Sequence, residues 1–406
     1  MKVLHILYQS LPNTAGSSIR SRDILEAQRK IGLFPIAVTA PFQAPKKENA
    51  TKETINGIIY YRTYSARPEE IVSEHQKSLN LKLRKLSRIF SFLKSATNIA
   101  KEEDVDIIHA HATFFCGITG KVIAKRLNKP FVYEVRSLWE ERKKAKANIF
   151  ERIQLNLITL IETFVMNLAD RVVVINQNLY ENIVDRGIEK NKIIVIPNAV
   201  NMALIDRNRG GQKDNSKKVT FGYIGSISPI EGLSLLVKVF SMLHEQGYEN
   251  KLLIFGDGSE KQNISDLISK HAIKNVKLMG SLPSEEVYKA YEQIDVIINP
   301  RSKSKIADSV TPLKPLEAMG FKKLVIASDV GGMKELIEDN VTGKLFKADS
   351  QKELFQCLIN IIDNWNDYQT IRENGYNFVC NEKSWIVNVE KYKKVYGQLS
   401  NKNDIK

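Results

Sequence analysis

The sequence predicts an α/β protein of two doubly wound domains, each built on a parallel β-sheet. Short, continuously apolar segments alternate with longer helical patterns along the chain, which is typical of parallel strands covered by helices on both faces. The pattern runs once, stops at a polar, glycine-containing segment at 208–218, and then starts again. A length of 406 residues and a hydrophobic content of 43% suit two domains with full cores.

The expected strands form two series of buried segments. The first series is 3–7, 36–40, 58–62, 106–111, 131–135, 171–175 and 193–197, and the second is 219–225, 251–256, 276–280, 295–300, 324–328 and 343–346. Because the polar segment between them reads as a linker, we expect a first domain of residues 1–205 and a second of 206–383.

Positive charge is concentrated in the first half of the chain. Residues 1–200 hold 31 Lys and Arg against 20 Asp and Glu, whereas residues 201–406 hold 29 against 26, which gives the net charge of +14. Segment 77–101 has seven basic residues, no acidic one, and apolar residues at partly helical spacing. It predicts either an amphipathic helix on an anionic membrane surface or a solvated helix packed on its own domain. The sequence has no nucleic-acid recognition motif, so we expect no nucleic-acid partner.

Cysteine usage and hydropathy point to a reducing compartment. Three widely spaced cysteines form no C-x-x-C pair and no Cys/His cluster, so the sequence indicates neither a zinc site nor a disulfide framework. No segment is apolar for long enough to read as a membrane span. We expect a cytoplasmic protein without a metal cofactor.

Polar residues at the ends of the first-domain strands are the first candidate site residues, because doubly wound domains bind ligands there. Gly16 precedes a helix whose free N–H groups can face an anion, and Arg20 follows it. His111 and its neighbour His109 are alternate residues and point the same way. Glu134 and Arg136 follow a buried strand and suggest contact with a substrate. A plain turn, structural histidines and a salt-bridged loop are the alternatives for these three segments.

The second domain has three comparable strand ends. Its candidate residues are Gly225, Ser226, Gly256, Asp257, Arg301, Ser309, Thr311, Lys314 and Glu317. Glu317 begins a helix, where its carboxylate can accept two hydrogen bonds from a ribose diol, or can instead interact with the helix dipole. Arg301 and Lys314 can neutralise a diphosphate, aided by the amides at Gly225 and Ser226.

The order of these loops resembles the family 4 retaining glycosyltransferases, which have the GT-B fold of two Rossmann-like domains facing a cleft. The most specific segment is LKPLEAMGFKKLVIASDVGGMKELIEDNVTGKLF (313–346), and VINQNLYENIVDRGIEKNKIIVIPNAVN (174–201) resembles the interdomain segment. The resemblance implies a UDP- or GDP-sugar donor, a glycan or lipid-diphosphate acceptor, and no metal. It also implies that the closing helix, within 384–406, packs back on the first domain.

Two departures from the family pattern concern the donor site. The Arg and Lys that usually hold the donor diphosphate are Ser226 and Glu231 here, and the first of two spaced glutamates is Ser309. Members with the same departures are typical of bacterial surface-polysaccharide pathways (capsule, exopolysaccharide or O-antigen). We expect Arg301 and Lys314 to replace the missing pair, and Gly16 and His111 to complete the catalytic set. The resemblance also implies that Arg20, Glu134 and Arg136 contact the sugar or the acceptor.

The resemblance therefore implies a hexosyl- or N-acetylhexosaminyltransferase. Two alternatives share the fold: a nucleotide-sugar 2-epimerase, which needs no acceptor, and a non-catalytic partner subunit. The missing Glu and the missing Arg/Lys pair favour the partner subunit, whereas the Leu-Glu-Ala-Met segment favours the transferase.

Overall fold

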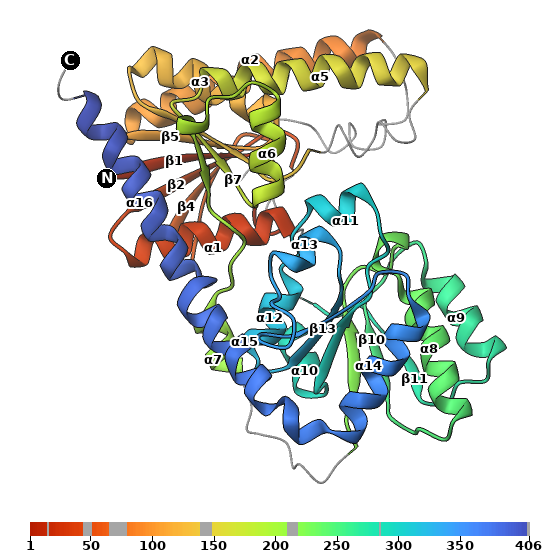
Figure 1. The fold of residues 1–406 in the computed structure, drawn as a ribbon. Coiled ribbons are helices and arrows are strands. Elements are labelled where there is room, and N and C mark those ends of the chain that lie inside the picture. Colours follow the sequence, from red (N-terminus) through yellow and green to blue (C-terminus); the bar gives the residue numbers. More distant parts are fainter. Residues whose placement is uncertain are drawn as a thin grey trace. The chain divides into compact units, whose positions relative to one another are not determined.

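The computed structural model describes residues 1–13, 16–43, 51–64, 79–138, 148–208, 218–283 and 286–403. Its chain forms two compact units, one of Met1–Pro197 with Asn388–Lys406 and one of Asn198–Val387 (Figure 1). The division falls at Pro197 rather than after residue 205. Val200 forms a bridge with Ser384, and Ile205 packs against Gly320, so this segment is held by the second unit. Most of the expected linker at 208–218 lies outside the described residues.

The first unit is an eight-stranded sheet of order β3-β4-β2-β1-β5-β6-β7-β8. Its strands are β1 (Lys2–Leu7), β2 (Phe34–Thr39), β3 (Lys52–Ile55), β4 (Ile58–Arg62), β5 (Ile107–His111), β6 (Phe131–Val135), β7 (Arg171–Val174) and β8 (Ile193–Val195). Its helices are α1 (Gly16–Lys30), α2 (Leu79–Glu102), α3 (Phe114–Leu127), α5 (Ile149–Leu168), α6 (Gln177–Asp185), the short turn η2 (Lys190–Lys192) and most of α16 (Trp385–Asn403).

Strand β3 is the one strand of the first unit that the sequence did not predict. It pairs antiparallel with β4 through a two-residue turn at Asn56 and Gly57, which have φ angles of 52° and 75°. An Asn-Gly pair is the usual signal of such a turn because both residues tolerate positive φ. The residues of β3 itself, KETI, are mostly polar and do not look like a buried strand, because β3 lies at the edge of the sheet.

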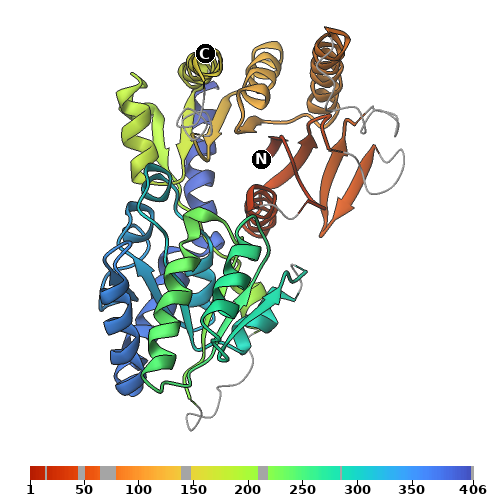
Figure 2. The same cartoon turned by 90° about the vertical axis from the view of Figure 1, so that its right-hand side faces the viewer.

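The two faces of the first sheet differ in chemistry. Leu4 and Ile6 of β1 pack with Phe92 of α2, Phe115 of α3 and Val165 of α5 in one apolar core. Figure 2 shows α2, α3 and α5 side by side over this face. The alternate residues of β1, β5 and β6 point to the other face, where α1 and α16 lie, and they include three histidines and a glutamate.

The second unit is a six-stranded parallel sheet of order β11-β10-β9-β12-β13-β14. Its strands are β9 (Phe221–Ile224), β10 (Leu252–Phe255), β11 (Val276–Gly280), β12 (Val296–Asn299), β13 (Leu324–Ser328) and β14 (Lys344–Phe346). Its helices are α7 (Met202–Asn208), α8 (Leu233–Glu245), α9 (Lys261–Lys270), α10 (Val287–Glu292), α11 (Lys305–Ser309), α12 (Lys314–Gly320), α13 (Gly331–Lys334), α14 (Gln351–Asp363) and α15 (Gln369–Glu382), with turns η3 (Pro229–Glu231) and η4 (Trp365–Tyr368).

Two apolar cores cover the faces of the second sheet. Residues of α8, α9 and α14 form one, and residues of α10, α12 and α15 form the other. Every strand expected from the sequence is present in the two units, so the prediction of two doubly wound parallel sheets is confirmed. Among the residues that the structure describes, no helix combines the length and the apolarity needed to cross a bilayer.

Candidate active site

The strand order of the second unit reverses between β9 and β12. The chain leaves β9 toward β10 on one side and later returns to place β12 on the other side. A crevice forms outside the carboxyl ends of strands at such a reversal, and it is the usual ligand site of doubly wound sheets. Gly225 and Ser226 follow β9, Arg301 follows β12, and α12 supplies Lys314 and Glu317. The reversal therefore lies among the residues that the sequence singled out.

Lys314 places its ammonium beside the backbone that leaves β9. A Cβ atom added to Gly225 would lie 2.0 Å from the Lys314 Nζ, and the Nζ lies 5.6 Å from the centre of the Tyr223 ring. Burial lowers the pKa of Lys314, while the carboxylates of Glu231 and Glu317 oppose that shift. Within the described part of the chain, this ammonium has neither a hydrogen bond nor an ion pair.

Arg301 is held by a carboxylate that the sequence did not pair with it. Its Nη2 and Nε donate to the two carboxylate oxygens of Glu231 at 3.0 and 3.3 Å, and its Nη1 donates to the Val310 carbonyl at 3.1 Å. Both side chains are buried. The pair is close to neutral, so Arg301 offers a diphosphate much less charge than Lys314 does.

Glu317 lies in the first turn of α12 and is partly exposed. The hydroxyl of buried Tyr291, on α10, donates to its Oε2 at 3.1 Å. Burial raises the pKa of Tyr291 well above its usual value, and the Glu317 carboxylate adds to that rise. Tyr291 remains a proton donor at neutral pH and fixes one carboxylate oxygen of Glu317.

The loop after β10 crosses the loop after β9 at close range. A Cβ atom on Gly256 would lie 1.7 Å from the Gly225 carbonyl oxygen, so glycine is required there. Asp257 is exposed and accepts a hydrogen bond from the Lys261 ammonium. Thr311 is buried, and its hydroxyl has no partner within the described residues. The side chain of Ser309 lies outside what the structure describes.

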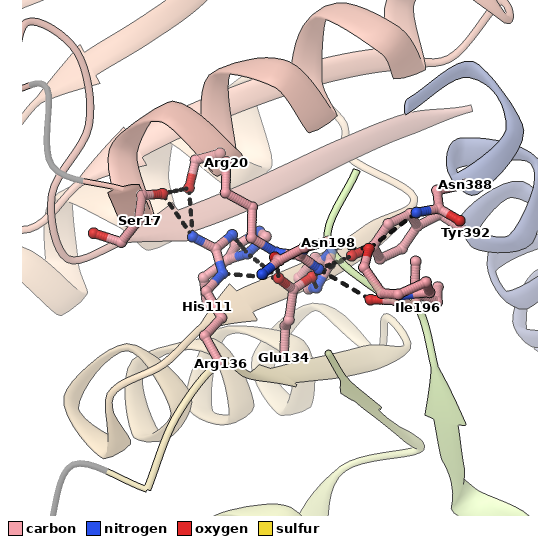
Figure 3. Close-up of polar contacts among 12 residues, drawn as sticks. Ser17, Arg20, His111, Glu134, Arg136, Ile196, Asn198, Asn388 and Tyr392 are labelled. Carbon is pink, nitrogen blue, oxygen red and sulfur yellow. Dashed lines mark hydrogen bonds and ion pairs between the residues drawn. The ribbon is translucent and has the colours of Figure 1, made fainter. Parts of the chain in front are cut away.

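In the first unit, Glu134 is the centre of a buried polar cluster (Figure 3). Its Oε1 accepts from Nε of Arg136 at 2.8 Å and from Nε of Arg20 at 3.1 Å, and Tyr392 of α16 donates to its Oε2. Burial alone would raise the pKa of Glu134, but Arg136 and Arg20 hold it well below its usual range. Because Glu134 is fully buried, it presents no surface to an acceptor in this conformation.

Arg136 links this cluster to the start of α1. Its Nη1 donates to the Ser17 carbonyl at 2.8 Å and to the Ser21 hydroxyl at 2.9 Å, and its Nη2 contacts His111. The contacts hold the α1 N-terminus, where Gly16 is exposed with open space around its Cα. Arg20 is buried and also donates to the carbonyls of Ile196 and Pro197.

Three histidines continue the cluster as a directed chain of hydrogen bonds. Gln28 Oε1 can only accept, so His5 donates from Nε2 and accepts at Nδ1 from His111 Nε2, which lies 2.8 Å away. His111 Nδ1 then accepts from Arg136. The Gln28 amide donates to Tyr396, whose hydroxyl donates to His109 Nδ1 at 2.7 Å. Each imidazole is thus neutral with its proton on Nε2.

The histidine pKa values agree with this assignment. Burial lowers the pKa of His111 to about 4, and it lowers those of His5 and His109 as well. The three rings bring ligand atoms within 4.8 Å of one another, which is close enough for a metal ion. However, two guanidinium groups adjoin the cluster, and the hydrogen bonds already use five of the six ring nitrogens. This donor set suits a neutral hydrogen-bond network better than a cation site.

Several residues of these clusters were not singled out from the sequence. Tyr291, Tyr392, Tyr396, Gln28 and His5 come from helices or strand interiors, where no strand-end pattern draws attention to them. Tyr8, directly after β1, was not singled out either; its ring lies 5.4 Å from that of Phe42 at a tilt of 35°, and the residue is 37% exposed. A search for polar residues inside otherwise apolar strands would have found His5.

Two family models match the chain over adjoining ranges. Residues 53–204 match Glycosyltransferase Family 4, and residues 205–378 match Glycosyl transferases group 1. An uncharacterized glycosyltransferase of Methanocaldococcus jannaschii is 25% identical over 344 residues, which cover 84% of this chain and 90% of that protein. The capsular polysaccharide biosynthesis glycosyltransferase CapM of Staphylococcus aureus is 23% identical over 323 residues, covering 76% of this chain and 81% of CapM.

Solved structures share the architecture. The crystal structure of HepE from Anabaena in complex with UDP has a TM-score of 0.73 at 16% identity, and the superposition covers 98% of this chain and 100% of that one. The two glycosyltransferase models together span 53–378, which includes most of both sheets. The chain is a glycosyltransferase of the GT-B fold.

Proposed function

We propose that this glycosyltransferase moves a hexosyl or N-acetylhexosaminyl group from a UDP- or GDP-sugar, with retention of configuration, to a glycan or lipid-linked acceptor. We further propose that it does so without a metal, in bacterial surface-polysaccharide biosynthesis. The single observation that carries the donor site is the Lys314 ammonium at the strand reversal of the second unit, which has no hydrogen bond or ion pair among the described residues. CapM, a capsule enzyme, and HepE, solved with UDP, support the pathway and the nucleotide.

The roles in the donor site follow from the charges. Lys314 binds the diphosphate, together with the Ser226 amide, because the Gly225 amide already donates to the Phe255 carbonyl at 2.8 Å. The partly exposed carboxylate of Glu317 accepts the ribose hydroxyls. Arg301 acts as a positioning residue, because Glu231 neutralises it and its Nη1 holds the Val310 carbonyl in front of α12. Stabilising the charge that develops on the departing diphosphate is then mainly the task of Lys314.

The proposed transfer needs no protein nucleophile. The acceptor oxygen bonds to the anomeric carbon on the face from which the diphosphate leaves, and the acceptor proton passes to the departing phosphate oxygen. In the first unit, the amides at the start of α1, which begins at Gly16, offer a place for an anionic group of a substrate. Arg136 keeps the start of α1 in place through Ser17 and Ser21, and His111 orients Arg136; neither side chain transfers a proton.

The membrane is the proposed place of action if the acceptor carries a lipid diphosphate. The excess of basic residues in the first half of the chain suits such an anionic acceptor at the inner face of the plasma membrane. A soluble anionic glycan would be attracted by the same charge, so the acceptor must be identified by transfer assays.

A thermal-shift screen against UDP-, GDP-, ADP- and dTDP-sugars tests the donor proposal. A ligand present at 100 times its dissociation constant stabilises the folded state by about 2.7 kcal/mol, which is readily measured. We expect a shift with one base and slow release of free sugar and nucleoside diphosphate without acceptor. The anomeric configuration of the transferred sugar, read by NMR, tests retention. Protein that binds none of these donors would overturn the proposal.

A further inference from the structure

Helix α5 of the first unit carries an exposed apolar stripe with the spacing of a helix–helix seam. Its members are Phe150, Ile153, Leu157, Leu160 and Phe164, which are 80%, 61%, 58%, 66% and 61% exposed. Successive members are three, four, three and four residues apart. This alternation keeps side chains in line along the contact where two helices pack together. A row of large exposed apolar side chains marks a docking surface.

The other side of α5 is used by the fold of its own domain. Val165 and Met166 belong to the apolar core beneath the helix, and Glu162 accepts hydrogen bonds from the Tyr133 hydroxyl and the Phe114 amide. A reciprocal capping box fixes the first turn. The helix is therefore held in place without the stripe, so substitutions in the stripe should leave the domain folded.

The residues of α5 beside the stripe carry no charge. Those with exposed or partly exposed side chains are Gln154, Asn156, Thr163 and Asn167. Between Ile153 and Leu168 the only ionisable residue is Glu162, and it is buried. A helix that lies on an anionic bilayer is normally rich in Lys and Arg on its polar face, whereas α5 has one basic residue, Arg152. A narrow apolar seam with a neutral rim suits another helix instead.

A second copy of α5 fits this seam when the two helices run antiparallel. Phe150 and Phe164 lie seven residues before and after Leu157. A two-fold axis at Leu157 therefore sets Leu157 against itself and each Phe150 against the Phe164 of the other copy. The antiparallel direction also separates the two first turns, which hold Glu151 and Arg152, and it opposes the helix dipoles. A contact of this kind uses the same surface on both copies and closes at two.

The stripe is large enough for a stable contact. Taking about 180 Å² for a whole large apolar side chain, the exposed fractions of the five members amount to about 600 Å² in each copy. Two copies would therefore bury about 1,200 Å², which is where the range of stable, specific interfaces begins. A monomer–dimer equilibrium that can be followed by dilution is the expected behaviour.

We propose that α5 is a homodimer interface, in which two copies of the chain pack their stripes antiparallel about Leu157. The inference goes beyond the proposed function, because it concerns how the chain assembles and not the reaction of each copy. The stripe contains none of the residues assigned to the donor or to the start of α1, so each copy keeps its own site.

Sedimentation equilibrium of the full chain at several concentrations tests this assignment. We expect a dimer whose Kd rises about a hundredfold or more in the variant Leu157→Gln, Leu160→Gln, because each dimer loses four buried apolar side chains. The matched control, Gln154→Ala, Asn156→Ala, changes two exposed polar residues of the same helix and should dimerise as the parent does. If the double variant fails to fold, Leu157→Gln alone carries the test. A parent chain that stays monomeric overturns the proposal, and so does a folded variant that dimerises normally.

Oxidative cross-linking tests the antiparallel arrangement. Leu157→Cys should form a disulfide between two copies, because the residue meets its own counterpart at the two-fold axis. Phe150→Cys alone should not, whereas Phe150→Cys combined with Phe164→Cys should. The parent chain, with its three cysteines, gives the background. Cross-linking of Phe150→Cys alone, without cross-linking of Leu157→Cys, would overturn this arrangement.

Flotation with vesicles that contain phosphatidylglycerol tests the other partner. A monomeric parent that binds these vesicles, and a double variant that does not, would assign the stripe to a lipid surface and overturn the proposal. A parent that dimerises in solution at the same concentration without vesicle binding supports it.

Donor binding separates this inference from the proposed function. Nucleotide-sugar binding by thermal shift should be the same in the parent and in the variant Leu157→Gln, Leu160→Gln. A dimer that binds no donor would refute the transferase proposal and leave the interface standing. A parent that binds a donor but stays monomeric at every concentration would refute the interface and leave the transferase proposal standing.

Discussion

Arg301 and Glu231 form a buried bidentate ion pair, with Nη2–Oε1 and Nε–Oε2 distances of 3.0 and 3.3 Å. The family resemblance leads one to expect a phosphate-binding lysine at the position of Glu231, and an acidic residue there repels an anionic donor. The pair removes that problem, because Arg301 neutralises Glu231 inside the domain. Lys314, supplied by α12 instead of the loop after β9, has no ion pair among the described residues and keeps its charge at the strand reversal.

Replacing Lys314 should weaken donor binding, whereas replacing Arg301 should lower the stability of the fold. Lys314→Ala removes a charged contact to the diphosphate, worth roughly 1.5–3 kcal/mol, so the donor should bind about tenfold more weakly or worse. Its stability should change little, because the ammonium has no ion pair within the described residues. Arg301→Ala leaves Glu231 buried and unpaired and should cost about 3–5 kcal/mol of unfolding free energy. Isothermal titration calorimetry with the donor measures the loss of binding, and urea unfolding measures the loss of stability. Equal losses of both quantities in the two variants would contradict these roles.

Gly225 should affect the donor only through Lys314. Alanine there would place a Cβ 2.0 Å from the Lys314 Nζ and 2.6 Å from the Tyr223 hydroxyl, which forces the ammonium to move. We expect Gly225→Ala to weaken donor binding nearly as much as Lys314→Ala, with no further loss in the double variant. Gly397→Ala, in open space on α16, is the control. Additive losses in the double variant would show that Gly225 acts independently.

Glu317 should bind the ribose, with Tyr291 as its support. Glu317→Gln weakens charge-assisted hydrogen bonds and should reduce donor affinity about tenfold. Tyr291→Phe removes the 3.1 Å hydrogen bond to Glu317 Oε2 and should give a smaller loss. Competition with a 2′,3′-dideoxy nucleoside diphosphate provides the check, because Glu317→Gln should not change its affinity. An equal loss of affinity for the dideoxy compound would show that Glu317 does not bind the ribose hydroxyls.

Acid should destabilise the first unit through its histidines. The pKa of His111 falls from 6.5 to about 4 because of burial, so the unfolded chain binds more protons than the folded one between these values. Stability is therefore complete above pH 6.5 and decreases as the pH falls toward 4, by roughly 3 kcal/mol from His111 alone. Urea unfolding at pH 7, 6 and 5 measures this slope. Nitrogen-15 spectra at pH 7 should show protons on Nε2 of His5, His109 and His111; a charged imidazole there would refute the network.

Tyr396 should stabilise the first unit from α16. Tyr396→Phe leaves both the Gln28 amide and His109 Nδ1 without a partner, which should cost about 2 kcal/mol or more in unfolding free energy. Tyr180→Phe is the matched control, because Tyr180 packs on the apolar core with no hydrogen bond from its hydroxyl in the described structure. Similar losses in both variants would indicate that ring packing, not the hydroxyl, is what matters.

The sequence by itself determined the two doubly wound sheets and the strand ends that carry Gly225, Arg301, Lys314 and Glu317. These follow from local periodicity and from the geometry of parallel strands, whose carboxyl ends share one edge. It did not reveal strand β3, because an edge strand needs only one buried face.

Only the tertiary structure decided which charged side chains are neutralised by an ion pair inside the fold. Glu231 and Arg301 are seventy positions apart in sequence, and Glu134 meets Tyr392 across 258, so no local pattern pairs them. Burial then sets their roles, since a charge removed from water must find a partner inside the fold. Helix α5 shows a related limit of the sequence. Its apolar residues Phe150, Ile153 and Phe164 are 80%, 61% and 61% exposed, because the sheet beneath covers only one side of the helix.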